Sequence, residues 1–176
     1  MPWRDVTLAV DAGLRLRPWR EADLAALLHH ADDARIVSGL SDRFPHPYTR
    51  ADGEAFLAGT VVDLSDPVFA IEIDGEACGG IGARPFAGER AVGAEFGYWL
   101  GHAHWDRGVM TRVVAAFAPW VMEAMALRRL QATVLDLNHA SARVLARTGF
   151  VEEGVLRNAV RKHDRVHDLR LFARIR

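Results

Sequence analysis

The residues best suited to chemistry lie in the turn from His102 to Thr111, which reads HAHWDRGVMT. Arg107 supplies a full positive charge, Gly108 lets a bulky ligand approach the backbone, and Thr111 offers a hydroxyl. The apolar stretch from Val109 to Leu127 predicts a helix buried on every side. Because the first amides of a helix lack intrahelical partners and carry partial positive charge, the turn predicts a phosphate site. The alternative is an ordinary strand-to-helix turn with a solvated Arg107.

The segments around this turn predict the elements that position it. Glu95 to Leu100 is aromatic and apolar, as in a strand buried on both faces. Pro119 must kink the helix or end it early, since a proline inside a helix costs about 3 kcal/mol. Arg128 to Leu137 then predicts a strand, and Asn138 to Phe150 predicts a helix with Asn138 as its N-cap.

Ordered motifs in this region identify a family resemblance. They are Gly97-Tyr-Trp-Leu100, Trp105-x-x-Gly-x-Met-Thr111, Asn138-x-x-Ser141 and Gly149-Phe-x-x-Glu-Gly154. The chain resembles the GNAT N-acetyltransferases and, within them, the RimJ and RimL branch of ribosomal-protein N-terminal acetyltransferases. The resemblance runs from about Leu14 to the end and is looser before Gly97. It implies one α/β domain over residues 1–176, with a central twisted, mostly antiparallel sheet flanked by helices.

The resemblance also implies acetyl-coenzyme A as cofactor, with coenzyme A as product. Its pyrophosphate is expected on the amides of residues 107–112, which are Arg107, Gly108, Val109, Met110, Thr111 and Arg112. A backbone amide around Trp99 and Leu100 is expected to meet the oxyanion, where the strand splays to admit the pantetheine arm. Asn138 is expected to hold the pantetheine or the phosphate side of the cofactor, in addition to its N-cap role.

The turn departs from the usual superfamily pattern, Gln/Arg-x-x-Gly-x-Gly/Ala. Trp105 stands first and Met110 last, as in variants of the RimJ/RimL branch. Asp106 stands where that branch often has glycine. A carboxylate there repels a pyrophosphate unless it points outward, so weaker cofactor affinity is one expectation.

Acetyl transfer to an amine requires donors for the oxyanion and a proton source for the leaving thiolate. Many GNAT enzymes use a tyrosine one turn into the helix after Asn138, but Leu145 stands there. The resemblance implies Ser141 as the proton donor; the alternative is a hydroxyl that bonds its own helix backbone. The two tyrosines, Tyr48 and Tyr98, are expected to bind the substrate.

The general base is harder to assign, because the terminal-hairpin glutamate of RimL-like enzymes aligns approximately with Val160. Glu95 is the best replacement, since desolvation in an apolar strand would raise its pKa. A structural ion pair is the alternative. Strict alternation puts Glu95 and Trp99 on one face of the strand and Tyr98 on the other, so only a bulge would bring both faces to one site.

No metal site is predicted, although the chain has eight histidines. His102 and His104 flank the turn without a third ligand in sequence. His163 with His167 and Asp168 forms a second group, but Asp168 matches a position in the RimJ/RimL terminal hairpin.

Composition bounds the class of protein. The chain has 176 residues, half of them hydrophobic, which predicts one domain with a sizeable core. The net charge of −1 gives no reason to expect nucleic-acid binding. Cys78 is the only cysteine, which fits the cytoplasm and a packing role. Met1 to Val10 does not read as a signal peptide, and the longest apolar run, Val113 to Met122, is too short to span a membrane.

The remaining segments predict the rest of the fold. We expect an edge strand over residues 14–17, helices over 20–31 and 49–62, a loop or substrate wall over 32–48, a hairpin of 68–73 with 76–82, and a terminal hairpin over 155–175 that turns near Asp164.

The sequence therefore predicts a cytoplasmic, acetyl-coenzyme A-dependent N-acetyltransferase, acting as a monomer or a homodimer. A protein N-terminal α-amine, a free amino acid, a polyamine or an antibiotic amine would each suit the scaffold as acceptor. The alternative from another class is a module that senses acyl-coenzyme A without turnover.

Overall fold

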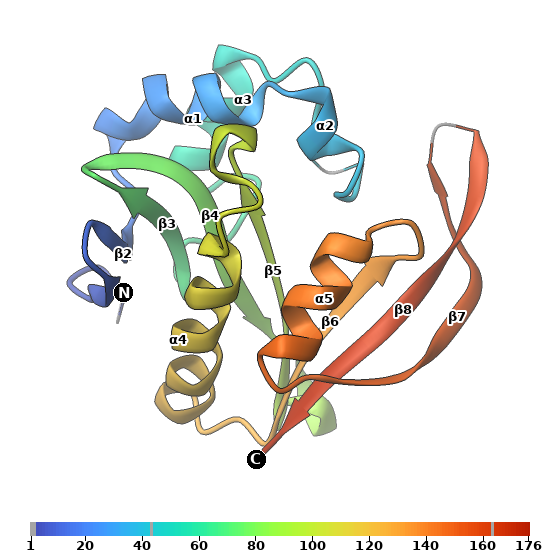
Figure 1. The fold of residues 1–176 in the computed structure, drawn as a ribbon. Helices are drawn as coiled ribbons and strands as arrows, with labels where there is room; N and C mark the ends of the chain where they lie inside the picture. Colours follow the sequence, from blue (N-terminus) through green and yellow to red (C-terminus); the bar gives the residue numbers. More distant parts are fainter. Residues whose placement is uncertain (1–2, 43, 163) are drawn as a thin grey trace.

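The computed structural model describes residues 3–42, 44–162 and 164–176, and its centre is a single sheet (Figure 1). The strands of this sheet lie in the order β1-β2-β3-β4-β5-β6-β8-β7. They are β1 (Leu8–Asp11), β2 (Leu14–Pro18), β3 (Val68–Ile73), β4 (Glu76–Pro85), β5 (Gly93–Leu100), β6 (Arg129–Leu135), β7 (Val151–Lys162) and β8 (Arg165–Ile175). Among the strands of the described residues, only β5 and β6 pair in parallel, so the predicted mixed, mostly antiparallel sheet is confirmed.

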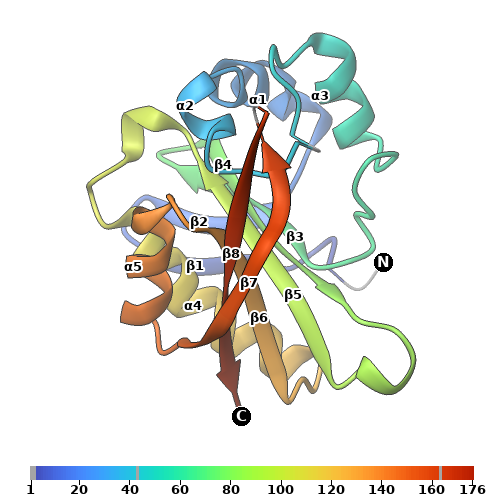
Figure 2. The same ribbon diagram turned by 90° about the vertical axis from the view of Figure 1, so that its right-hand side faces the viewer.

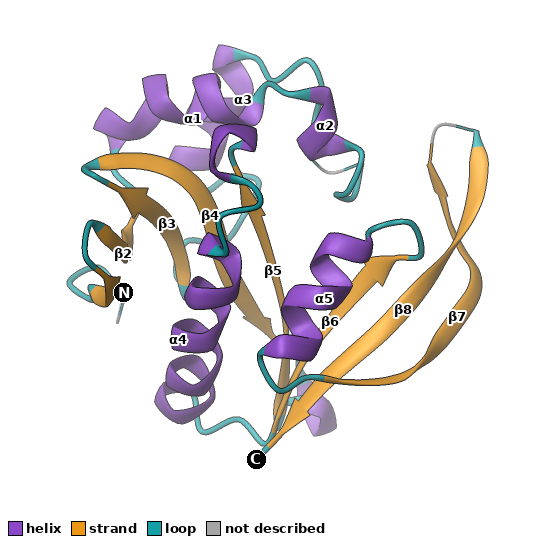
Figure 3. Cartoon of the chain, viewed as in Figure 1, coloured by secondary structure: helices purple, strands orange, loops and turns teal. Residues whose placement is uncertain are grey.

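Helices cover one face of the sheet and one of its ends (Figure 3). They are α1 (Leu24–Ala31), α2 (Ala34–Val37), α3 (Arg50–Leu57), α4 (Val109–Ala124) and α5 (His139–Arg147), with short 3₁₀ turns η1 (Glu21–Asp23), η2 (Gly88–Arg90) and η3 (His102–His104). The main core joins α4 to the sheet through residues such as Phe117 and Phe69, which are fully buried. A second, smaller core holds Leu27 and Tyr48 beneath α1 and α3.

The sheet opens between its two central strands. β5 pairs with β6 only from Gly93 to Glu95, opposite residues 129–131. Beyond that point β5 stays with β4 as far as Leu100, whereas β6 follows β8. In Figure 1, β5 and β6 lie together near the C terminus of the chain and apart at their other ends. Figure 2, turned by 90°, shows the β7–β8 hairpin crossing in front of β6.

Three expectations about the elements of the site differ from the structure at least in part. α4 runs through Pro119 and ends at Ala124, so of the two effects expected of the proline, a kink or an early end, the early end is wrong. The helix is also exposed along one face, which includes Ala115 and Glu123. β5 is not buried on both faces, because β6 departs and leaves Gly97 exposed.

Two further elements differ from the sequence-based expectation. α3 ends at Leu57 because Gly59, at φ 75°, closes it: the Gly59 amide donates to the Phe56 carbonyl, and the Thr60 amide donates to the Ala55 carbonyl. β2 is not an edge strand, since β1 pairs along its outer side. The Asp74-Gly75 hairpin and the terminal hairpin at Asp164 are confirmed. No helix in the described part of the chain combines the length and apolar character needed to cross a membrane.

Candidate functional site

A cavity of about 890 Å³ lies where the two halves of the sheet separate. Its walls come from the end of β5, the turn before α4, α5, the α2 segment and the β7–β8 hairpin. The cavity therefore exists because β5 and β6 stop pairing after Glu95, and α5 occupies only part of the opening.

Two contacts join the α2 segment to the opposite wall of the cavity. The Asn138 Nδ2 donates to the Gly39 carbonyl at 3.3 Å. The Lys162 ammonium, with its side chain 6% exposed, donates to the Leu40 carbonyl and pairs with Asp42 at 3.3 Å. The irregular stretch after α1 is thus a wall of the cavity, which was one of the two interpretations of the sequence.

The turn before α4 presents a run of unbonded amides. Asp106 and Gly108 both adopt positive φ, at 58° and 67°. The first intrahelical bond runs from the Arg112 amide to the Gly108 carbonyl at 3.2 Å. The amides of residues 107–111 donate no hydrogen bond to any described residue, so they are free for an anion. Arg112 was wrongly included among the expected donors, because its amide is used within the helix.

The side-chain charges at this turn differ from expectation. Arg107 is exposed and does not line the cavity. The Arg112 guanidinium donates to the Arg107 carbonyl at 3.1 Å and pairs with Asp11 at 3.4 Å. Positive charge on the cavity wall comes instead from other elements: Arg143 and Arg147 of α5, Arg35 of α2, and Lys162 and Arg165 of the terminal hairpin. Asp106 also lines the cavity, so its carboxylate is close enough to oppose a bound phosphate.

Alternate residues of β5 direct their backbone amide and carbonyl groups toward the opening left by β6. The Gly101 amide donates to Cys78 on β4 at 2.7 Å, and the Leu100 carbonyl accepts from the Trp105 indole at 2.7 Å on the other side. By alternation, the Leu100 amide points toward the gap left by β6, while the Trp99 amide points toward β4. Of the two residues expected to meet an oxyanion, the geometry therefore favours Leu100. Trp99 also lines the cavity, and its ring stacks on Trp19 in the smaller core at a centroid distance of 6.5 Å.

The N-terminus of α5 brings three predicted residues together. Asn138 caps the helix as expected, its Oδ1 accepting from the Ser141 amide at 3.0 Å. Tyr98 reaches the same turn and donates its hydroxyl to the Ser141 carbonyl at 3.4 Å. Burial raises the pKa of Tyr98 to about 12, so its hydroxyl stays protonated at neutral pH. The Ser141 hydroxyl makes no hydrogen bond with a described residue, and Ser141 lines the cavity.

Two further predicted residues, Glu95 and Tyr48, lie outside the cavity lining, as Arg107 and Arg112 do. The Glu95 carboxylate accepts a hydrogen bond from the Thr133 hydroxyl at 3.0 Å and pairs with Arg84 at 3.7 Å. This agrees with the alternative role considered for Glu95, a structural ion pair. Tyr48 packs in the smaller core against Phe44, at a ring-centroid distance of 5.2 Å. Burial raises the pKa of Tyr48 to about 12, and its side chain does not reach the site.

The structure adds a pair that the sequence did not identify. His167 of β8 lines the cavity, and its Nδ1 lies 3.2 Å from Asp136 Oδ1. In the hairpin His167 stands opposite Val160, the position at which a glutamate base was sought. Only the strand register reveals this placement. Asp168 accepts from the Asn158 amide at 2.8 Å, a structural role, and His163 lies outside the described residues.

Comparison with known families and proteins fits this geometry. The family model for the acetyltransferase (GNAT) domain matches residues 13–151. The ribosomal-protein-serine acetyltransferase of Escherichia coli K12 is 34% identical over 82 residues, which is 47% of this chain and 46% of that protein. An uncharacterized N-acetyltransferase of Bacillus subtilis, YoaA, is 32% identical over 80 residues, or 46% of this chain and 45% of that protein. The matched stretch thus spans about half the length of these curated relatives.

Solved structures resemble the whole fold. The RimL ribosomal L7/L12 α-N-protein acetyltransferase in complex with coenzyme A aligns with a TM-score of 0.85 at 21% identity, covering 97% of this chain and 98% of that one. A GNAT acetyltransferase from Bacillus anthracis aligns with a TM-score of 0.84 at 18% identity, covering 97% and 98%. At these identities the likeness concerns the fold.

Variants at Asn138 should separate its two structural roles. Asn138→Ala removes both the cap and the bond to Gly39, and we expect it to lower the free energy of unfolding by about 1–2 kcal/mol. Asn138→Asp keeps a good cap acceptor and loses only the donor to Gly39, so its loss should be smaller. Urea denaturation measures both. Equal losses for the two variants would contradict the capping role.

Proposed function

The chain belongs to the GNAT acetyltransferase family, and on that premise we propose that it transfers an acetyl group from acetyl-coenzyme A to a primary amine. One observation carries the proposal: a single cavity is lined both by residues 108–111, whose amides are free, and by Leu100 on the open side of β5. The first set suits the pyrophosphate of the cofactor, and the second suits its thioester carbonyl.

The proposed reaction begins with a neutral amine attacking the thioester carbon. A carbon–nitrogen bond forms, and the carbonyl oxygen becomes an oxyanion that the Leu100 amide stabilises. The carbon–sulfur bond then breaks, and coenzyme A leaves as a thiolate. The amine loses one proton and the thiolate gains one, so the chain has to supply an acceptor and a donor at the cavity.

Ser141 is the proposed donor for the thiolate. Its hydroxyl lies on the cavity wall without a hydrogen-bond partner among the described residues, while its backbone is held by Asn138 and Tyr98. The helix cap therefore fixes the position of the hydroxyl, and the hydroxyl is free to rotate toward the sulfur.

His167 is the proposed base for the amine. The hydrogen bond to Asp136 orients the imidazole through Nδ1, which leaves Nε2 to accept the proton. The side chain of His167 is 15% exposed and lies on the cavity wall, whereas Glu95 is engaged with Thr133 and Arg84 outside it. His167 therefore takes the role first considered for Glu95.

The acceptor proposed first is a protein N-terminal α-amine, with small-molecule amines as the alternative class. Its support is the partial match to the ribosomal-protein-serine acetyltransferase together with the fold shared with RimL. The cytoplasm is the proposed location, because the single Cys78 cannot form an internal disulfide.

A thiol-release assay with acetyl-coenzyme A and a panel of peptides and small amines tests the function. We expect turnover with at least one amine, and loss of cofactor binding in Gly108→Pro, because proline cannot adopt φ 67° and lacks an amide hydrogen. Gly88→Pro is the matched control, because Gly88 also has a positive φ, 63°, but lies in η2 outside the cavity lining. The Gly88→Pro variant should bind the cofactor normally. Cofactor binding without turnover on any amine would instead indicate a sensor of acyl-coenzyme A.

Removal of the Ser141 hydroxyl should slow chemistry without weakening binding. General acid catalysis contributes roughly 10²–10⁴-fold, so Ser141→Ala should lower kcat within that range while cofactor affinity changes little. Steady-state kinetics and calorimetry measure the two quantities. A loss of kcat below about tenfold would mean that solvent protonates the thiolate and that Ser141 only orders the helix.

Removal of the His167 imidazole should slow the reaction. His167→Gln should lower kcat by about 10²–10⁴-fold, because the imidazole no longer accepts the amine proton. Asp136→Asn should cause a smaller loss, since it disturbs only the orientation of the ring. His139→Gln, at an exposed histidine outside the cavity, is the control. Full activity in His167→Gln together with inactivity in Glu95→Gln would transfer the role of base to Glu95.

A further inference from the structure

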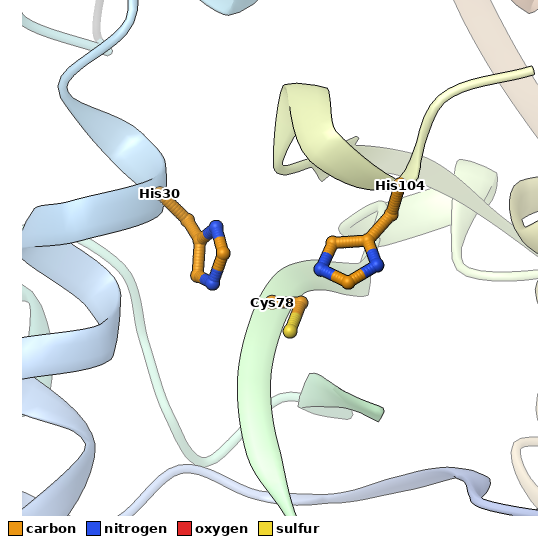
Figure 4. A group of neighbouring side chains, drawn as sticks. All are labelled: His30, Cys78 and His104. Atoms are coloured by element: carbon orange, nitrogen blue, oxygen red, sulfur yellow. The ribbon is translucent and has the colours of Figure 1, made fainter. Parts of the chain in front are cut away.

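Three side chains that can bind metals converge beside the cavity, from elements far apart in the sequence. His30 lies in the last turn of α1, Cys78 lies on β4, and His104 belongs to η3, before the turn that leads into α4. One ligand atom from each lies within 4.8 Å of the others. Figure 4 shows the two imidazoles facing each other, with the Cys78 sulfur below and between them.

The donor set of two imidazole nitrogens and one sulfur suits Zn²⁺. Zinc–nitrogen bonds of about 2.0–2.1 Å and zinc–sulfur bonds of about 2.3 Å place two nitrogens and one sulfur of a tetrahedral site about 3.3–3.6 Å apart. The present separations, all within 4.8 Å, exceed these distances by about 1.5 Å at most. Small rotations of side chains that already face one another would close the difference.

The surroundings of the cluster also favour a cation. His30 is 8% exposed and Cys78 is 1% exposed, so two of the three groups are removed from bulk water. Within the described part of the chain, the ring nitrogens of His104 have no hydrogen-bond partner. Glu76 brings a carboxylate to the same place, its Oε1 lying 3.1 Å from His30 Nε2. This is close to the separation of two ligands that share one ion.

The backbone leaves space for the cluster at Gly101. A Cβ atom at this position would lie 2.5 Å from His30 Nδ1, which is closer than side chains tolerate. Glycine therefore allows the His30 ring to pack directly against the segment that carries His104. The sequence alone showed only His102 and His104 near each other, because His30 and Cys78 approach through the fold.

We propose that His30, Cys78 and His104 bind a Zn²⁺ ion, with the Glu76 carboxylate as fourth ligand. Burial and the nearby Glu76 raise the pKa of the Cys78 thiol to about 11, so the ion displaces the thiol proton to solvent as the zinc–sulfur bond forms. The ion would link α1, β4 and η3 and thereby hold the start of the phosphate-binding turn. The site does not depend on the proposed acetyl transfer.

Metal binding by the full chain tests the proposal. The protein is freed of metal with a chelator and titrated with Zn²⁺ by calorimetry, and with Co²⁺ by absorption spectroscopy. We expect one ion per chain, and with Co²⁺ a thiolate-to-metal charge-transfer band that direct Cys78 ligation produces. Zn²⁺ should also raise the melting temperature, because an ion that binds only the folded state stabilises it.

Conservative variants distinguish this site from binding by surface histidines. Cys78→Ser should remove the charge-transfer band, and His30→Gln and His104→Gln should each weaken Zn²⁺ binding at least tenfold, with folding checked by circular dichroism. His29→Gln changes the neighbouring residue of α1, which is outside the cluster, and should bind as the unaltered chain does. Zn²⁺ affinity that is unchanged in Cys78→Ser and His30→Gln, or a Co²⁺ complex without the thiolate band, would overturn the proposal.

Discussion

The separation of β5 from β6 is the constraint on which the site depends. Parallel strands gain hydrogen bonds along their whole length when they stay paired, yet this pair stops after Glu95 and Gln131. Each strand keeps its other neighbour, so the sheet remains continuous at one end and opens at the other. The polar backbone that would have been satisfied by pairing is instead directed into a cavity, where it can bind a polar substrate group.

The rest of the site is arranged around this opening. The turn before α4 lies beside the end of β5, joined to it by the bond from the Trp105 indole to the Leu100 carbonyl. α5 fills part of the gap, and its capping residue Asn138 also holds the α2 segment at Gly39. The residue that caps α5 thus also connects two walls of the cavity. His104 of η3 likewise belongs to two groups of residues: it lines the cavity, and it lies beside His30 and Cys78.

Much of the fold followed from local patterns in the sequence. The Asp74-Gly75 hairpin and the Asn138 cap were predicted because each depends on a few adjacent residues. The expected end of α3 at about Val62 was wrong, because Gly59 closes the helix with a Schellman motif after Leu57. α4 continues through Pro119 because packing of its buried face outweighs a local propensity.

The sequence by itself determined the family, the turn before α4 and the strand that accompanies it, because ordered motifs and helix-end signals lie in contiguous residues. Only the tertiary structure decided which groups meet at the cavity. His167 approaches Asp136 through the register of β8 beside β6, and Glu95 faces Thr133 and Arg84 because β6 still lies beside it there. His30, Cys78 and His104 likewise converge from three separate elements. Such contacts join residues that are far apart in the chain. The distance between these residues in space therefore cannot be predicted from their spacing in the sequence.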